Sequence, residues 1–518
     1  MKINYENSFK LNQFESLQNE INSLLKEYEF KTEFSYENTK LTQKLKTRLN
    51  KREFKNRINL TNIPFCTIDG ETTKDFDDAV YAFKQKKDFN VMIAIADVAH
   101  YVKENSAIDI DARERFASIY YSGNCIPMLP AKLSDKLCSL EPYVSKLCIN
   151  VSFTIKQDGK INNINLYPAV MQSKAKLTYL QVQDLFDSDY FNKDEIPETV
   201  LESIKTLRQI SLILRKKYLK RGFVNLAIPE QQIILDNQNK PLSIISSNLS
   251  ESHLLIENLM ITTNEIVAIF FKKQNIKSIF RTHKPPGFEK IYYFLKKFNN
   301  SAFEILIKKK IFKDYAAQTS ATNTINDQQL LSKLVFYTKK YFNKTIPENI
   351  FLQCMTKAFY DVENIGHFGL SSRHYMHFTS PIRRYPDLLT HRILREFWNK
   401  KHKVRDFKKI AYHCNIQERK IMEFERKIQF LHIAQLMKNN IKKRYIGIII
   451  NKIRFGIFVR LKTLPVDGLI AYNSESISPI IKNNFQIGDN VLVELIGICN
   501  EKQYLNFEYV SNQNNSSA

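Results

Sequence analysis

The sequence lacks the features that carry a chain into or across a membrane. No apolar run reaches the roughly 18 residues that a membrane-spanning helix needs. The first residues, MKINYENSFKLNQ, contain no apolar stretch of the kind found in a signal peptide. We therefore expect a cytoplasmic protein without a membrane partner. With 518 residues, 43% of them hydrophobic, the chain is long enough for several domains and a large folded core.

Paired cysteines are also missing. The seven cysteines are odd in number, are scattered from Cys66 to Cys499, and include no CxxC pair. This spacing gives no support to a disulfide framework or to a thiolate zinc site. We expect free, buried thiols in a reducing compartment.

Acidic residues are in short supply. The 53 Asp and Glu residues face 77 Lys and Arg residues, which leaves a formal net charge of +24. An excess of this size indicates a polyanionic partner, most often a nucleic acid. The alternative is that a composition rich in Lys and Asn only reflects an AT-rich genome.

Against this background, the segment IDGETTKDFDD at 68–78 gathers five carboxylates: Asp69, Glu71, Asp75, Asp77 and Asp78. Asp69 ends an apolar, strand-like run, and the other aspartates follow after one short loop, so several side chains can point to one place. Carboxylates held together repel one another, and a divalent cation removes that penalty. Oxygen ligands favour a hard ion, Mg²⁺ or Mn²⁺. A basic surface would collect a phosphodiester, and this cluster would hold the metal that cuts it.

The acidic segment has two other interpretations. An acidic loop is most often solvated surface, without any ligand. An EF-hand calcium loop needs acidic residues at positions 1, 3 and 5 and Gly at position 6, but here Gly70 directly follows Asp69. The calcium loop is therefore excluded, and the solvated loop stays open at this level.

A second constellation, HFTSPIRRYPDLLTHR at 377–392, places the adjacent Arg383 and Arg384 between two prolines. Adjacent arginines suit bidentate binding of phosphate or stabilisation of developing charge. Surface ion pairing is the alternative. Nearby, His367, His374 and His377 have no cysteine or carboxylate that would complete a zinc pattern, so we expect them to form hydrogen bonds in a core or loop.

The texture of the chain changes twice. Residues 1–58 look helical, and the densely basic stretch 40–57 is either a solvated helix face or an RNA-contacting arm. Strand-like runs begin near residue 65, with a hairpin predicted between 79–83 and 91–98. Helical patterns cover 194–220 and 253–272, and residues 405–440 predict one or two long helices, whereas 287–345 is ambiguous. From about residue 442, five short strands predict a small β-barrel.

Taken together, these motifs resemble the ribonuclease II (RNB) family of exoribonucleases, in particular its ribonuclease R type. The matching motifs, in family order, are TIDGETTKDFDDAVY (67–81), VMIAIADVAHYV (91–102), IPMLP (126–130), LSDKLCSL (133–140), SKAKLTY (173–179), IENLMI (256–261), FRTHKPP (280–286), ENIGHFGL (363–370) and HFTSPIRRYPDLLTHR. The resemblance implies an α+β protein in which a mixed α/β catalytic domain precedes an OB-fold barrel. The expected divisions are a basic helical region (1–58), the catalytic domain (59–440), the OB fold (441–511) and a disordered tail (512–518).

The resemblance also implies an activity. We expect a processive, hydrolytic 3′→5′ exoribonuclease that degrades single-stranded RNA to nucleoside 5′-monophosphates. Its Mg²⁺, for which Mn²⁺ could substitute, would be held by residues matching the family's aspartates: Asp69, Asp75, Asp77 and Asp78. Asp77 matches the position most directly tied to cleavage, and Asp78 is counted as catalytic beside it.

The remaining implied roles concern the substrate. Arg383 matches the arginine that stabilises the scissile phosphate, and Arg384 beside it is assigned to substrate binding. Tyr120 matches a tyrosine that stacks on or positions the 3′-terminal nucleotide, and Tyr179 matches a second substrate tyrosine. Glu257 matches a glutamate that contacts the terminal nucleotide. Out of context, the two tyrosines would be ordinary half-buried aromatics, and Glu257 would pair with a nearby cation.

The sequence departs from the family in three places. Residues 1–58 do not resemble cold-shock folds, the tail SNQNNSSA is not Lys-rich, and Leu226 stands where the family often has an aromatic residue. A catalytically weak RNA-binding protein that uses the same channel is the rival function, and a nuclease with another main activity is a second. We expect a monomer, with the ribosome or the RNA-degradation machinery as candidate protein partners.

Overall fold

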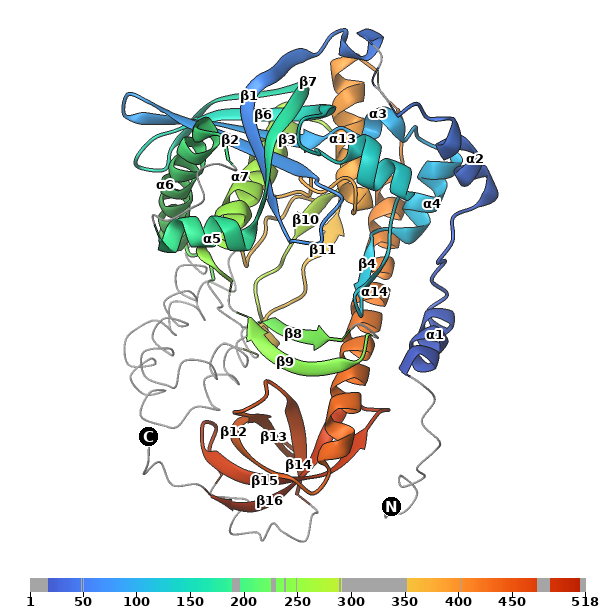
Figure 1. The fold of residues 1–518 in the computed structure, drawn as a ribbon, viewed down its shortest axis with the longest axis vertical. Helices are drawn as coiled ribbons and strands as arrows, with labels where there is room; N and C mark the ends of the chain where they lie inside the picture. The colour runs from blue at the N-terminus through green and yellow to red at the C-terminus, as the bar shows by residue number, and fades with distance from the viewer. Residues whose placement is uncertain are drawn as a thin grey trace.

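The computed structural model describes residues 17–512 apart from 48, 50, 189–195, 225–229, 237–238, 248, 288–289, 291–351, 402 and 473–484. Most of the ambiguous segment 287–345, the residue Leu226 and the tail after 512 lie outside the described residues. Two closed β-barrels dominate the structure, one near each end of its long axis, and a long helix connects them (Figure 1). This arrangement confirms the expected fold class, a mixed α/β part followed by a small barrel.

The first barrel is built from five strands in the order β1-β2-β3-β6-β7. Their bounds are β1 Ile58–Asp69, β2 Asp78–Gln85, β3 Asp88–Ala96, β6 Ser145–Ile155 and β7 Ile161–Thr178. β1 and β7 pair in parallel and close the barrel, while the other neighbours are antiparallel. The predicted hairpin is β2–β3, joined by a tight turn at Lys86, where φ is +58°. Apolar side chains that are at most 1% exposed fill the interior, among them Val80, Ile93 and Ile149.

Helices surround this barrel. On one side lie α5 (Tyr179–Asp187), α6 (Glu198–Arg221) and α7 (Glu251–Lys273), and on the other α3 (Val98–Tyr101), α4 (Ala107–Arg115) and α13 (Tyr385–Trp398) (Figure 1). A π-type helical turn spans Lys132–Cys138. Among the described helices, α7 is the one long and apolar enough to cross a bilayer. However, 67% of its apolar window is buried inside the protein, as in a core helix.

An ion cluster joins Arg57, the residue before β1 and the end of the basic stretch 40–57, to Asp97, the residue after β3. The Arg57 guanidinium lies 2.5 Å from the Asp97 carboxylate, and both side chains are almost fully buried. Arg395 forms a second short ion pair with the same carboxylate. Arg57 is therefore neither on a solvated helix face nor on an RNA-contacting arm. Ahead of it, the described chain forms α1 (Leu17–Glu27), α2 (Tyr36–Lys44) and a 3₁₀ turn (Lys51–Phe54).

The second barrel has the strand order β12-β13-β14-β16-β15. The strands are β12 Arg444–Ile453, β13 Gly456–Leu461, β14 Asp467–Ala471, β15 Asn490–Cys499 and β16 Tyr504–Asn512. Its buried core also contains Ile433 and Met437 from the end of α14 (Phe407–Met437). The helical pattern at 405–440 is thus one continuous helix that runs from the first barrel into the second.

Three two-stranded sheets complete the described fold. β8 (Glu230–Leu235) and β9 (Pro241–Ser247) lie between the two barrels, with Ile244 buried in the core of the second (Figure 1). β10 (Phe280–Thr282) pairs with β11 (Phe359–Asp361). β4 (Ile119–Tyr121) pairs with β5 (Asn124–Ile126) beside α14. All seven cysteines are free, and five are buried.

Candidate active site

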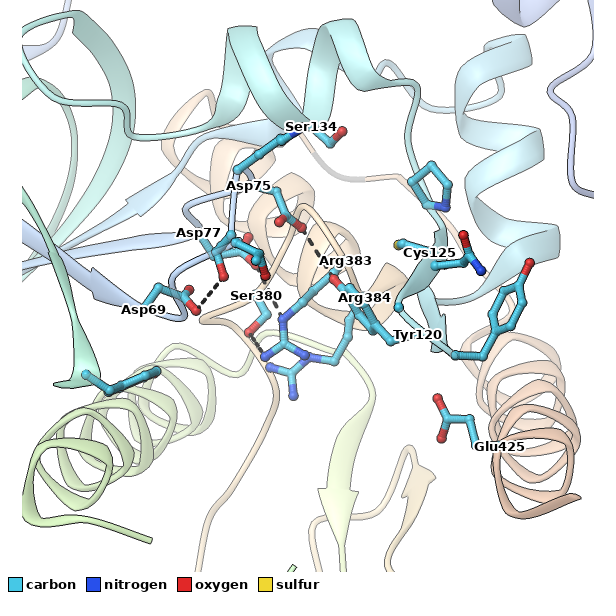
Figure 2. A pocket seen from close by; sticks show the side chains of 18 of the residues that line it. Asp69, Asp75, Asp77, Tyr120, Cys125, Ser134, Ser380, Arg383, Arg384 and Glu425 are labelled. Carbon is cyan, nitrogen blue, oxygen red and sulfur yellow. Dashed lines mark hydrogen bonds and ion pairs between the residues drawn. The ribbon is translucent and has the colours of Figure 1, made fainter. Parts of the chain in front are cut away.

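One large cavity of about 1690 Å³ brings the nine candidate residues together. They come from the end of β1 and the loop after it, the start of β2, the β4–β5 hairpin, the start of α5, the first half of α7 and the loop before α13. The residues are Asp69, Asp75, Asp77, Asp78, Tyr120, Tyr179, Glu257, Arg383 and Arg384. Figure 2 shows Asp69, Asp75 and Asp77 facing Arg383 in this cavity.

The strand ends explain why the carboxylates gather. Asp69 is the last residue of β1 and Asp78 is the first residue of β2, so both lie at the same end of the barrel. The loop between them is held in a turn, because Asp69 Oδ1 accepts hydrogen bonds from the Gly70 backbone N–H at 2.6 Å and from Thr73 Oγ1 at 3.0 Å. The predicted geometry, a strand end followed by a tight loop, is therefore what the chain adopts.

Burial changes the acidity of this cluster. It raises the pKa of Asp77 well above its usual range, although the positive charge of Arg383 offsets part of that rise. Burial, followed by repulsion from Asp69, raises the pKa of Asp78 to about 7. The pKa of Asp75 is also raised, mainly by burial. These carboxylates are costly to keep charged at neutral pH unless a cation joins them.

The aspartate carboxylates fit a hard divalent cation that also binds water and substrate oxygens. Within the described part of the chain, no group of three or more His, Cys, Asp or Glu side chains is arranged to hold a metal ion by itself. Mg²⁺ is usually bound by one or two carboxylates together with water and substrate phosphate oxygens, so a complete protein cage is not required. The four clustered carboxylates supply oxygen ligands of the kind that such a site needs.

Arg383 and Arg384 have different surroundings despite being adjacent. Arg383 Nε lies 3.6 Å from Asp77 Oδ2, its Nη2 donates to Ser380 Oγ at 3.2 Å, and 45% of its side chain is exposed to the cavity. Arg384 instead donates to the carboxylate of Asp387 at 2.7 Å, and that carboxylate is fully buried. Arg383 is free to meet a ligand, whereas Arg384 lines the cavity while holding an internal ion pair. The third arginine of the motif, Arg392, is buried against Asp109.

The two tyrosines lie on either side of the carboxylates. Tyr120 on β4 is 48% exposed, and its hydroxyl donates to Asp75 Oδ2 at 3.4 Å. Tyr179 is the first residue of α5, whose start is fixed by a capping box between Thr178 and Gln181. Its ring stacks on the His253 ring with 3.9 Å between centroids, so one face of Tyr179 is already covered. Both rings can offer a flat apolar surface to a base.

Glu257 lies on α7, one helical turn after His253, in the same cavity. Its carboxylate is 3.8 Å from Arg215 Nη1, so the cation that the sequence left open as a partner is present at the edge of ion-pair distance. Burial raises the pKa of Glu257. Glu257 lines the cavity, and its contact with the terminal nucleotide stays a prediction.

Sequence reasoning missed one wall of the cavity. Glu425, Gln429 and His432 of α14 line it, opposite the tip of the β4–β5 hairpin. Burial raises the pKa of Glu425, which Figure 2 shows near that hairpin. The signal was present as polar residues spaced four and three apart on a helix that is otherwise apolar toward the core.

The three histidines weighed for zinc have hydrogen-bond partners instead. His377 Nδ1 pairs with the Tyr360 hydroxyl at 2.9 Å, and His374 Nδ1 pairs with the Asn364 amide at 2.9 Å. His367 packs its ring against His283, and burial lowers its pKa to about 3. All three belong to the packing around the loop before α13 that carries Arg383 and Arg384, called the arginine loop below.

Comparison with known proteins gives the site its context. Residues 57–400 match the family model described as RNB domain. Ribonuclease R of Mycoplasmopsis pulmonis (strain UAB CTIP) is 35% identical over 450 residues, which cover 85% of this chain and 59% of that protein. The chain thus spans less than two thirds of the length of this relative.

Solved structures agree with the sequence match. A structure of Mycoplasma genitalium RNase R in complex with ribose methylated single-stranded RNA has a TM-score of 0.85 and 28% identity, over 95% of this chain and 78% of that one. A more distant structure, yeast Ssd1, described as a pseudonuclease, has a TM-score of 0.68 at 16% identity over 93% of this chain and 59% of that one, which shows a shared fold alone. The match over residues 57–400, joined to the strand-end carboxylates and the arginine loop, shows that this chain belongs to the RNB-domain family.

Proposed function

We propose that this protein is a metal-dependent 3′→5′ exoribonuclease that degrades single-stranded RNA to nucleoside 5′-monophosphates. One observation carries the proposal: four aspartates and an exposed arginine share a cavity with two tyrosines, in a chain similar to ribonuclease R. The net charge of +24 supports a polyanionic substrate.

Asp69, Asp75, Asp77 and Asp78 would hold Mg²⁺ or, in its place, Mn²⁺. When bound, such an ion activates water and stabilises the charge that builds on a phosphate undergoing in-line displacement. The hard oxygen ligands support this choice of ion, and the burial that raises the pKa values of Asp75, Asp77 and Asp78 favours a bound cation over unpaired carboxylates. The solvated-loop interpretation has less support, since Asp77 is only 6% exposed and contacts the arginine loop.

The protein's own groups then have separate tasks. Arg383 is placed to neutralise charge on the scissile phosphate, because its guanidinium is exposed and is oriented by Asp77 and Ser380. Tyr120 and Tyr179 are placed to stack on bases, which holds any sequence because every base has a flat π-face. Glu257 is placed to contact the terminal nucleotide. Arg384 is within the same cavity, and we assign it a substrate contact in addition to its ion pair.

The wider setting is also a proposal. A monomer in the cytoplasm that turns over mRNA or defective stable RNA would suit the free cysteines and the basic charge. Processive action would need a second RNA-binding site away from the cavity. The second barrel, at the far end of α14, is one candidate for that site.

The rival is an RNA-binding protein with weak or no catalysis. A described pseudonuclease has the same fold, so the fold by itself does not decide between them. The presence of all four aspartates and of Arg383 favours the nuclease.

The deciding experiment is a time course on 5′-labelled single-stranded RNA, with Mg²⁺ and EDTA lanes and an Asp77→Asn control. Conversion of full-length RNA to a very short labelled product without intermediates, only with Mg²⁺ and wild-type protein, is expected. A ladder of intermediates would indicate distributive action. Tight binding without cleavage would favour the rival, and cleavage of circular RNA or of DNA oligomers would indicate a different main activity.

A further inference from the structure

The β4–β5 hairpin is too short to be stable without contacts to the rest of the protein. Each strand has three residues, and the two-residue turn between them has positive φ at Ser122 (+48°) and at Gly123 (+73°). Two positive φ values belong to the tight turns that suit hairpins, although Ser adopts them less readily than Gly. Because isolated two-stranded hairpins are marginally stable at best, this one needs anchors elsewhere in the protein.

Ile119 and Ile126 at its base are buried in the core, and two contacts closer to its tip lie on one face of α14. Ser122 Oγ and His432 Nε2 are 2.5 Å apart and share a hydrogen bond. His432 is only 2% exposed, and its Nδ1 is buried without a partner, so the ring directs its hydrogen bonding to Ser122. Two turns earlier on the helix, the buried Phe424 ring meets the Tyr121 ring edge-on, with 5.6 Å between centroids.

The opposite side of the same strand carries Tyr120. Successive side chains of a strand point to opposite sides, so Tyr121 packs toward α14 while Tyr120 faces the carboxylates. The Tyr120 hydroxyl reaches Asp75, as described above, but at 3.4 Å this contact is long and weak. The position of the Tyr120 ring therefore depends on how firmly the hairpin is fixed on its α14 side.

We infer that His432 is a positioning residue: through Ser122 it fixes the hairpin tip on α14 and thereby sets the Tyr120 ring against the carboxylate cluster. The inference rests on the proposed function only where it assigns Tyr120 a substrate contact. The anchor itself is a structural statement that can be tested without cleavage.

Cys125 provides that test. It is exposed, and it lies directly across the hairpin from Tyr120. Five of the other cysteines are buried, and Cys499 is half-buried, so a Cys499→Ser background leaves Cys125 as the main reactive thiol. In this background, His432→Ala and Ser122→Ala should each speed maleimide labelling of Cys125 about fivefold, the population change that one net hydrogen bond is worth.

His432→Gln serves as the matched control. The Gln amide reaches the place of Nε2 and can still bond Ser122, so labelling should return close to the wild-type rate. Ser122→Ala guards against a trivial result, since it removes the same bond at the hairpin tip without emptying the buried His432 site. Equal labelling rates in wild type, His432→Ala and Ser122→Ala would overturn the anchor.

The second readout is the length of the final labelled RNA product. If His432 acts through Tyr120, His432→Ala and Tyr120→Ala should lengthen the end product in the same direction, and the double variant should equal Tyr120→Ala. Additive lengthening would show that His432 acts independently of Tyr120 and would overturn the inference. An unchanged product in Tyr120→Ala would remove the proposed role of Tyr120, and the labelling rates would then decide the anchor by themselves.

Discussion

The carboxylate of Asp77 accepts a hydrogen bond from the backbone N–H of Ile382 at 2.8 Å. This bond joins the acidic loop to the arginine loop, two segments 305 residues apart in the sequence. The other oxygen of the same carboxylate faces Arg383. Asp77 therefore has two tasks, since it orients the arginine loop in addition to its proposed part in metal binding.

The first prediction separates these tasks with Asp77→Asn. The Asn carbonyl can still accept from Ile382, so the thermal midpoint should stay close to wild type. Turnover should fall at least about 100-fold, because the metal site loses one negatively charged ligand at the place where charge develops on the reacting phosphate. RNA binding measured by fluorescence anisotropy should be nearly unchanged. A variant that stays active would contradict the assignment of Asp77 to the metal site.

Arg383→Ala should affect the chemical step. Its guanidinium is half-exposed and its ion pair with the buried Asp77 carboxylate is long, at 3.6 Å, so the stability of the protein should change only modestly. Single-turnover cleavage should slow about 100-fold or more, while affinity for RNA changes far less. Arg383→Lys keeps the charge but loses the planar geometry and should recover only part of the rate. An equal loss in affinity and in rate would mean that Arg383 serves ground-state binding.

Arg384→Ala is the contrasting neighbour. It would leave the Asp387 carboxylate buried without its cation, which typically costs about 3–5 kcal/mol of unfolding free energy. Chemical denaturation should show this loss directly. Adding Asp387→Asn should restore much of the stability, because the unpaired charge is then gone. A stable Arg384→Ala variant with weak RNA binding would instead give Arg384 a purely substrate-directed role.

RNA binding should weaken steeply with salt. For single strands, the slope of log affinity against log salt is roughly −0.7 per neutralised phosphate. A cavity of about 1690 Å³ in a chain with a net charge of +24 should let an RNA strand contact several phosphates, so a slope near −3 or steeper is expected if the strand threads into it. Anisotropy titrations with Asp77→Asn avoid cleavage during the measurement. A flat affinity from low to moderate salt would contradict threading.

Stability should fall as the solution is made acidic, and His391 should account for part of the loss. Its ring is fully buried, pairs with the Phe378 carbonyl at 2.8 Å, and has a pKa lowered by burial from 6.5 to about 4. Since the unfolded state binds the proton more tightly, this contribution is complete above pH 6.5 and is lost as pH falls toward 4. At most it is about 3 kcal/mol. Denaturation curves of wild type and His391→Gln across this range should therefore converge as pH falls.

Local features of the site followed from the sequence alone. Asp69 ends β1 and Asp78 starts β2 because an apolar alternating run, a Gly-containing turn and a second run lie next to one another in the chain. The β2–β3 hairpin and the helices around 198–221 and 407–437 have the same local origin. Periodicity and turn residues carry this information without any knowledge of distant partners.

Long-range pairings did not follow from periodicity. Ser122 and His432 are 310 residues apart, and neither lies in a pattern that names the other. In the sequence, Arg384 is indistinguishable from Arg383. The two differ only in the folded protein, where the start of α13 buries the Asp387 carboxylate against Arg384. Arg57 read as part of a basic surface stretch because its partner Asp97 comes from the far end of β3. Only the family resemblance placed Arg383 beside the aspartates in advance.

Helix α14 has 31 residues, which corresponds to a length of about 46 Å. One end of it is packed beside the first barrel, its middle holds the β4–β5 hairpin, and its last residues are buried in the second barrel. One inserted residue between His432 and Met437 would turn the second barrel by about 100° and move it by about 1.5 Å relative to the cavity. The number of residues in α14 therefore sets the angle at which an RNA strand that passes from the second barrel to the cavity would approach the four carboxylates.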